Sequence, residues 1–403
     1  MISDRDSIPS NPTPASDGTL QALRGLFVAE LILVLASGLA PTTFVVHAIA
    51  AGRSAAFFGA LGALYSVGVF IAYVLGPVLL AKLSFRRIGF VAAPLLISGI
   101  LSGLIPIPET WLVGRLLIGL GIGLFFLTTE AWIGVATSGP VKVRALARYG
   151  AVIYGAFVVA QLVLLVVHPT TDGPILISAI AALVGFVVLA RVQKPAAPAP
   201  TVQNPFLGAG LIIRHAPESM FMTLASGLLV GASSSFGPAY AVSIGLPREQ
   251  VSLLLLSTMV GAVVAQPFFG RMANRFGARQ VLIGMALITM GASIALFNVV
   301  AWGWLVAFIA AIWGSTGSTG YAIGASIAHA ADHGRHPVEV ARIALILNGI
   351  GGIIGPILSA VLVSHFGPAG IYIFAALVSL LVALAMVVAL SYRRHQRVNH
   401  QLV

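Results

Sequence analysis

Residues 368–392 read PAGIYIFAALVSLLVALAMVVALSY, a stretch without a charged side chain. A helix of about 20 mostly apolar residues is long enough to cross the hydrocarbon core of a bilayer. Because lipid offers no partner to backbone N–H and C=O groups, a spanning stretch of this kind must be an α-helix. The stretch therefore predicts a transmembrane helix.

The same apolar pattern recurs along the whole chain. Of its 403 residues, 59% are hydrophobic and 8% are charged, whereas a soluble domain carries about 25% charged residues. Most of the surface must therefore face lipid, and the predicted fold class is all-α and polytopic, with twelve transmembrane helices. The predicted spans are 24–47, 56–81, 88–105, 111–135, 147–168, 174–191, 217–243, 251–270, 279–298, 302–329, 341–364 and 368–392.

The segments between the spans divide the chain. Residues 1–21 are polar, lack the layout of a cleavable signal peptide and are predicted to be an N-terminal tail. The longest connection, 192–216, is rich in proline and is predicted to be an extended linker. It separates two six-helix bundles, 22–191 and 217–392, and residues 393–403 form a basic C-terminal tail.

Charge placement predicts the orientation. With the N-terminus inside, all of the 22 Lys and Arg residues except Arg53, Arg115 and Arg248 fall in cytoplasmic segments, as the positive-inside rule expects. Both termini are therefore predicted to be cytoplasmic. The net charge of +11 then faces membrane lipids, and no nucleic-acid partner is predicted. The absence of cysteine excludes disulfides and thiolate metal sites.

Two helices carry matching Gly/Pro interruptions. The first span is predicted to break at Gly38–Pro41, and the seventh at Ser233–Pro238. Paired interruptions of this kind mark the substrate site of a transporter, because unwound turns free backbone groups to face a cavity. Pro41, Ser235 and Pro238 are therefore candidate cavity residues.

Two loops carry related basic motifs. They read Lys82-Leu-Ser-Phe-Arg86-Arg87-Ile-Gly89 and Gly270-Arg-Met-Ala-Asn274-Arg275-Phe-Gly277, the second followed by Arg279. Both resemble the G-x-x-x-D-R-x-G-[RK] loop motif of the major facilitator superfamily. The resemblance covers residues 22–392 and implies two six-helix bundles, a site between them near the midplane, and alternating access. The residues that it implies for conformational control are Arg87, Gly89, Gly270, Asn274, Arg275, Gly277 and Arg279.

Both copies of the motif lack its acidic residue. Arg86 and Asn274 stand where the family has aspartate, and Lys82 replaces the first glycine. The ion-pair cluster that the motif builds must therefore be weaker here or be supplied by other residues. The alternative is that these arginines only enforce topology.

The fourth span carries an arginine followed by spaced glycines, Arg115-Leu-Leu-Ile-Gly119-Leu-Gly121-Ile-Gly123. This resembles the family's R-x-x-x-G-x-G signature, which implies that Arg115 lines the cavity. An arginine in a span is costly and usually functional. The alternative is that its side chain reaches the outer surface.

The antiporter motif G-P-x-x-G-G is absent from the fifth span, and a related run, Gly349 to Pro356, lies in the eleventh. Its absence counts against a drug/proton antiporter. The glycines of the eleventh span either act as the antiporter motif does in the fifth or allow close packing of helices.

A narrower resemblance rests on Thr129-Glu130-Ala-Trp132, Arg144 and Gln161. It is to a bacterial branch of the superfamily that includes riboflavin and copper importers, which implies an inner-membrane location. Copper members use Met and His pairs in the seventh and eighth helices, and the eighth span here has Met259 but no histidine. Copper import is therefore disfavoured, and a vitamin-like solute such as riboflavin fits better.

Two acidic residues lie within predicted spans. Glu30 is expected to bind a proton or pair with a cation, unless it is solvated at the interface. Glu130 is expected near the cytoplasmic end, as a gate residue that pairs with Arg144 or as a surface salt bridge. Tyr65, Phe126 and Trp313 are candidates to stack on a planar substrate or to pack against other helices.

No metal, cofactor or enzymatic role is predicted. His329 and His333 have helical metal-ligand spacing, but a solvated loop is favoured, and no phosphate-binding loop of an ATPase is present. The predicted function is secondary transport of a small organic solute by a monomer, with proton coupling through Glu30 left open. The alternative is efflux of drugs or amphipathic compounds, and copper import or a non-transporting receptor is less favoured.

Overall fold

The computed structural model describes residues 23–137, 139–192, 216–299, 303–317, 319–331 and 337–401. Within these ranges the chain is helical and has no strand, which confirms the all-α fold class. In the part of the chain that the structure describes, eleven helices are long and apolar enough to cross a membrane. The predicted tail 1–21 and nearly all of the predicted linker lie outside the described residues.

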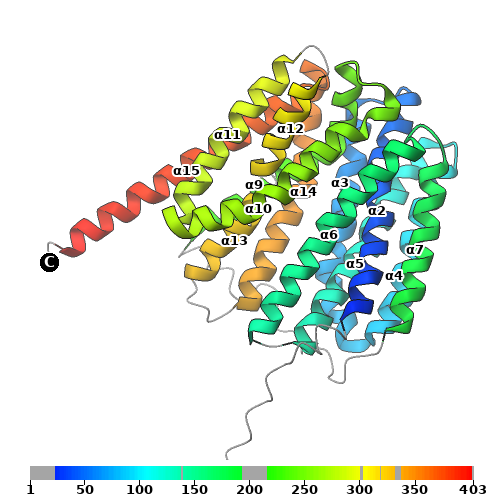
Figure 1. Ribbon diagram of the computed structural model, residues 1–403, viewed down its shortest axis with the longest axis horizontal. Helices are drawn as coiled ribbons and strands as arrows, with labels where there is room; N and C mark the ends of the chain where they lie inside the picture. Colours follow the sequence, from blue (N-terminus) through cyan, green and yellow to red (C-terminus); the bar gives the residue numbers. More distant parts are fainter. Residues whose placement is uncertain are drawn as a thin grey trace, which may run out of the picture.

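The first bundle is built by the helices before the linker (Figure 1). Within it, α2 packs on α6 and α7, α3 along α5, and α4 on α5 and α7. Its elements are α2 (Arg24–Ala50), α3 (Ala55–Lys82), α4 (Phe85–Leu101), the 3-10 turn η1 (Ser102–Leu104), α5 (Pro108–Ala136), α6 (Gly139–Val167) and α7 (Gly173–Arg191).

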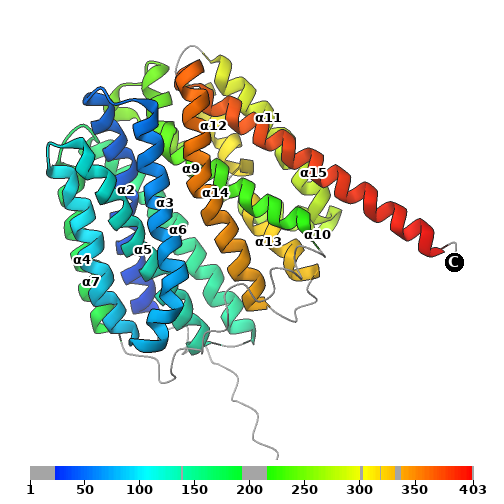
Figure 2. The ribbon, with the colours of Figure 1, turned by 180° about the vertical axis from the view of Figure 1, so that it is seen from behind.

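The second bundle stands beside the first (Figure 2). Here α9 packs along α14, α10 along α12, and α11 along α15. Its elements are α9 (Pro217–Ser243), η2 (Arg248–Gln250), α10 (Ser252–Phe276), α11 (Ala278–Asn298), α12 (Trp304–Gly317), α13 (Gly320–Ala331), α14 (Pro337–Phe366) and α15 (Gly370–Gln401).

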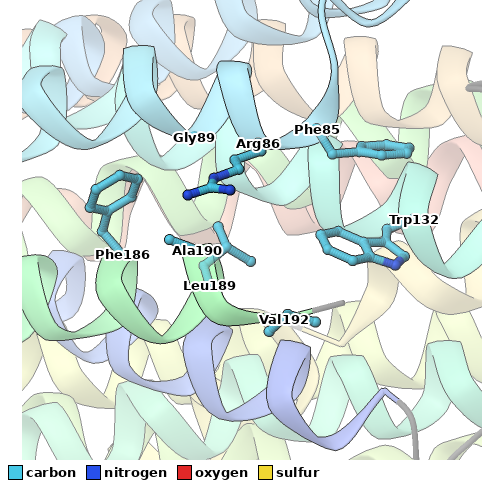
Figure 3. A pocket seen from close by; sticks show the side chains of 8 residues that line it. All are labelled: Phe85, Arg86, Gly89, Trp132, Phe186, Leu189, Ala190 and Val192. Carbon is cyan, nitrogen blue, oxygen red and sulfur yellow. The ribbon is translucent and has the colours of Figure 1, made fainter. Parts of the chain in front are cut away.

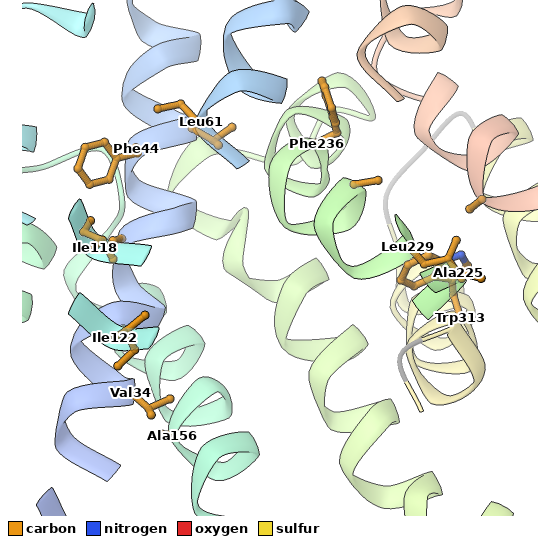
Figure 4. Close-up of a cluster of buried hydrophobic side chains, with 14 of the residues drawn as sticks. Val34, Phe44, Leu61, Ile118, Ile122, Ala156, Ala225, Leu229, Phe236 and Trp313 are labelled. Atoms are coloured by element: carbon orange, nitrogen blue, oxygen red, sulfur yellow. The ribbon is translucent and has the colours of Figure 1, made fainter. Parts of the chain in front are cut away.

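Each bundle has buried side chains between its own helices (Figure 4). Phe44 and Ile118 lie in the first, and Leu229 and Trp313 lie in the second. These side chains are 3% exposed or less. Both bundles therefore have a packed interior, and the buried side chains of the two interiors form one continuous cluster.

The predicted helix breaks at Pro41 and Pro238 are wrong. Both prolines lie inside continuous helices, α2 and α9. A proline removes one backbone hydrogen bond, but neighbouring helices and hydroxyl side chains can satisfy the freed groups. The carbonyls that lose a donor are those of Ser37 and Ser234, four residues before each proline. Hydroxyls nearby bond to other carbonyls of the same helix, Thr43 to Leu39 O and Ser235 to Gly231 O.

The tenth predicted span is two helices rather than one. α12 ends at Gly317 and α13 begins at Gly320. The sequence between Ser315 and Gly320 consists of Ser, Thr and Gly, which are weak helix formers. The hydroxyls of Ser315 and Thr319 donate to backbone carbonyls three and four residues back. The last helix also differs, because α15 continues past residue 392 into the predicted basic tail, to Gln401.

The two bundles meet where α3 packs against α9 and α14, where α6 packs against α10 and where α2 packs against α9. A Cβ on Gly352 would lie 3.4 Å from Ser66 Cβ, and one on Gly349 3.6 Å from the Phe70 ring. The ring centroids of Phe58 and Phe236 are 6.4 Å apart. We call these contacts the closed seam. They extend from Phe58, near the start of α3, to Phe70, just past its middle, and so leave the end of α3 at Lys82, on the side where the linker joins the bundles, outside the seam.

Candidate functional site

The Glu30 carboxylate is completely buried inside the first bundle. Thr129 Oγ1 on α5 donates to Glu30 Oε2 at 2.8 Å, and the Tyr149 hydroxyl on α6 donates to Oε1 at 3.4 Å. The alternative that Glu30 is solvated at the membrane interface does not fit this burial. Three helices therefore converge on one acidic group.

A second carboxylate lies beside the first. Glu130 on α5 interacts electrostatically with Glu30 and with the phenols of Tyr73, Tyr149 and Tyr321. We call these five residues the acid–tyrosine cluster. Since Tyr321 belongs to α13, the cluster takes side chains from both bundles. Two carboxylates among phenols suit a proton or a cationic group better than an anion.

The pairing of Glu130 with Arg144 stays a prediction. Glu130 is half-buried, and Arg144 is exposed near the start of α6. The described neighbours of Glu130 place it toward the interior of the molecule, between the bundles.

Arg115 is buried against α3. Its side chain is 3% exposed, and its Nε donates to Leu61 O at 3.2 Å. The guanidinium carbon lies 4.5 Å from the centroid of the Tyr65 ring. Its Nη1 is buried without a hydrogen-bond partner. A buried unsatisfied donor is costly, so this nitrogen is a candidate donor to a ligand. The side chain does not reach the outer surface.

Several other candidates lie where the helices pack. Gln161 is buried and accepts a hydrogen bond from Thr42 Oγ1 at 3.5 Å. Ser235 faces Gly62 across the closed seam. Phe126 is half-buried against the core of the first bundle.

Trp313 does not join these residues. It is 2% exposed, its Nε1 donates to Ser293 Oγ at 2.9 Å, and its ring meets Tyr372 edge-on. All three residues belong to the second bundle. Trp313 therefore packs against other helices of its own bundle, as the alternative expected, and does not stack on a substrate between the bundles.

Four tyrosines in or near the site were not predicted from the sequence: Tyr73, Tyr149, Tyr154 and Tyr321. Tyr154 on α6 interacts with the side chain of Gln266 on α10, where the two bundles pack together. A tyrosine within an apolar span was the available signal, because its hydroxyl needs a partner there.

The second loop motif retains an ion pair. Arg279 Nε and Nη2 donate to Glu218 Oε1 at 2.9 and 2.5 Å, joining the first turn of α11 to that of α9. Gly277 separates α10 from α11 with a φ of +95°, a conformation that favours glycine. Arg275 lies 5.2 Å from the Phe276 ring centroid, while Gly270 and Asn274 are exposed. An acid from outside the motif, Glu218, therefore pairs with its last arginine.

The first loop motif is arranged differently. The Arg87 backbone N–H donates to Ser84 Oγ at 3.4 Å, which caps α4, and the Arg87 side chain is exposed. Gly89 is buried, and the Arg86 guanidinium carbon lies 5.7 Å from the Phe90 ring centroid.

The described residues contain no group of three or more His, Asp or Glu side chains that could hold a metal ion. His329 lies on α13, whereas His333 falls outside the described residues. The spacing noted in the sequence is therefore not tested.

Residues 219–402 match the family model described as Major Facilitator Superfamily. Among curated proteins, an "Uncharacterized MFS-type transporter YcaD" of Salmonella heidelberg (strain SL476) is 23% identical over 338 residues. That alignment covers 81% of this chain and 85% of the relative.

Solved transporters share the fold. The nucleoside transporter NupG superposes with a TM-score of 0.74 at 15% identity, covering 93% of this chain and 99% of that one. A POT family transporter in complex with a thioalcohol-conjugated peptide gives a TM-score of 0.70 at 12% identity, covering 93% and 96%. Together, the family match, the relatives and the fold support a membrane transporter of the major facilitator type.

Proposed function

We propose that this protein takes up a small organic solute by alternating access, with the acid–tyrosine cluster between the bundles as the place where solute or protons bind. One observation carries the proposal. The described contacts of the closed seam reach from the Ala55 end of α3 to just past its middle, and the acid–tyrosine cluster lies on the linker side of them.

The position of the cluster follows from the helices. Glu30 lies in the first two turns of α2, and Glu130 in the last two turns of α5. Both of these helix ends are on the side of the linker, whereas Ser66 and Gly352 meet near the middle of α3 and α14. Rocking one bundle against the other would open the seam and change the surroundings of the cluster.

The buried carboxylate supports a coupling role. An isolated charged carboxylate is expensive to bury, so Glu30 needs a proton or a cationic partner at some stage of the cycle. Arg115 supplies the opposite chemistry, since its orphaned Nη1 can donate to an anionic or carbonyl oxygen. Arg115 and Glu130 are 15 residues apart on α5, about 22 Å along the helix, so a small solute with both an acceptor and a basic or hydroxyl group would use the two sites one after the other.

A crosslink across the seam tests alternating access. The Cβ–Cβ separation of 3.4 Å between Ser66 and Gly352 is close to that of a disulfide, and the chain has no cysteine of its own. We expect oxidation of a Ser66→Cys/Gly352→Cys variant to stop transport and reduction to restore it.

The matched control places a crosslink within one bundle. A Cβ on Gly76 would lie 3.9 Å from Leu127 Cβ, between α3 and α5. Oxidation of Gly76→Cys/Leu127→Cys should leave transport unchanged. If the seam crosslink forms and transport continues at the full rate, the bundles do not rock about this seam.

Uptake into vesicles tests the solute and its direction. The panel includes riboflavin, a nucleoside and a dipeptide, and amphipathic dyes test efflux as the alternative. We expect uptake of an organic solute to respond to an imposed proton gradient in the wild type. In Glu30→Gln the response should disappear while membrane levels stay normal. Gradient-driven expulsion of dyes without uptake of any solute would favour efflux.

A further inference from the structure

A groove opens at the linker end of the first bundle, between α4, α5 and α7 (Figure 3). Its walls are largely apolar, and the Arg86 side chain is the one charged group among its lining residues. Those residues are Phe85, Arg86, Gly89, Trp132, Phe186, Leu189, Ala190 and Val192.

The walls are firmly packed. The rings of Phe85 and Trp132 stack with centroids 5.5 Å apart, and Trp132 is 5% exposed. Gly89 forms part of the groove because it has no side chain, and an added Cβ would lie 3.7 Å from the Phe186 ring. The groove is therefore a fixed feature of the packed bundle end.

The surroundings of the groove are basic at the end of the bundle and apolar one turn further along α4. Arg87 and Arg191 are exposed beside it, next in sequence to the lining residues Arg86 and Ala190. Along α4, Phe90 and Val91 are 52% and 46% exposed. In a membrane-spanning helix such side chains face hydrocarbon. The groove thus joins a cationic rim to a lipid-facing surface.

We propose that this groove binds the headgroup of an anionic phospholipid. The phosphate oxygens would accept hydrogen bonds from the Arg86 guanidinium, and an acyl chain would lie along Phe90 and Val91. Trp132 stands at the level of the headgroup, where interfacial aromatics are favourable. A water-soluble phosphate compound would leave the apolar side of the groove unused, which favours a lipid.

Fluorescence quenching by brominated lipid tests the proposal. The signal of Trp132 is the difference between the wild type and Trp132→Phe, both reconstituted in phosphatidylcholine vesicles. We expect brominated phosphatidylglycerol to quench this signal more than brominated phosphatidylcholine does. Excess inorganic phosphate should not reverse the quenching, whereas reversal by phosphate would assign the groove to a soluble anion instead.

Charge variants identify the residue responsible. We expect Arg86→Gln to weaken the phosphatidylglycerol effect roughly tenfold, as for the loss of one charge-assisted contact. Arg271→Gln removes an exposed arginine from the linker end of α10 and should have no effect. Equal quenching by the two lipids, or equal behaviour of the two variants, would overturn the proposal.

A second measurement does not depend on Trp132. Phosphatidylglycerol should raise the thermal unfolding midpoint of the wild type and of Arg271→Gln in detergent, but not that of Arg86→Gln. Gly89→Ala should fold, because its Cβ meets ordinary contact distances, and should reduce the shift by narrowing the groove. A shift that is unchanged in both Arg86→Gln and Gly89→Ala contradicts the proposed site.

Discussion

Substituting Gly227 with alanine should strongly destabilise the second bundle. A Cβ at this position would lie closer than 3.0 Å to backbone atoms of Asn348 on α14. A Cβ on Gly231 of α9, or on Gly351 or Gly355 of α14, would also lie within 3.0 Å of backbone atoms of the partner helix. These residues form two facing small-xxx-small pairs, which let the helix backbones approach each other.

The magnitude follows from this geometry. Because the obstacle is backbone, no side-chain rotation relieves it, and α9 and α14 must part by roughly 1 Å, a gap that loses a quarter to a half of each dispersion contact across it. Overpacking of this kind costs about 1–3 kcal/mol or more. For a unit of this size, each kcal/mol lowers the unfolding midpoint by roughly 2–4 °C.

The assay compares Gly227→Ala with Gly284→Ala by thermal unfolding in detergent. Gly284 lies on α11, and an added Cβ there meets nothing within 4 Å. The control should be neutral or stabilising by up to about 1 kcal/mol, since alanine is the better helix former. Equal midpoints for the two variants would refute the close-packing explanation for the glycines of α9 and α14.

Three further predictions concern interactions in the second bundle. Arg279→Gln should lower the unfolding free energy by about 3 kcal/mol, because it removes a charged partner from the nearly buried Glu218. Adding Glu218→Gln to this variant should recover part of the loss, measured by thermal unfolding. No recovery would mean that the two residues are not coupled. Trp313→Phe should cost about 1 kcal/mol through its lost hydrogen bond to Ser293, and Ser293→Ala should add nothing further to it. Gly277→Ala should cost about 1–3 kcal/mol because its φ of +95° strains any side chain, and an unchanged midpoint would show that the turn adapts.

The spans could be predicted because the bilayer leaves few choices. Lipid requires every spanning segment to be a helix, so long apolar stretches locate the elements directly. The prediction of a single tenth span was wrong for a local reason. Hydrophobicity does not report the weak helix propensity of the Ser/Thr/Gly run after Gly314. At Pro41 and Pro238 the error was the opposite one, because breaks were predicted in helices that are continuous. Their missing N–H groups are visible in the sequence, but the packing that keeps α2 and α9 helical is not.

The candidate site was predictable only residue by residue. A charged side chain in a span is unusual enough to single out Glu30 and Arg115. Their partners could not be assigned, because Thr129 and Tyr149 come from other helices and helix rotation is not encoded in hydrophobic periodicity. Trp313 shows the same limit, since an aromatic residue in a span can face a cavity, lipid or its own bundle.

The two halves share a fold but use their corresponding loops differently. In the second half, Arg279 pairs with Glu218, so an internal ion pair joins α9 to α11. In the first half, Arg86 replaces the expected acid and lines a groove at the bundle surface. A cation there must find its counter-charge elsewhere, and the membrane is the nearest source of anions. The linker ends of the two bundles would then be stabilised differently. The second would depend on the ion pair within the protein, and the first on the anionic lipid around it.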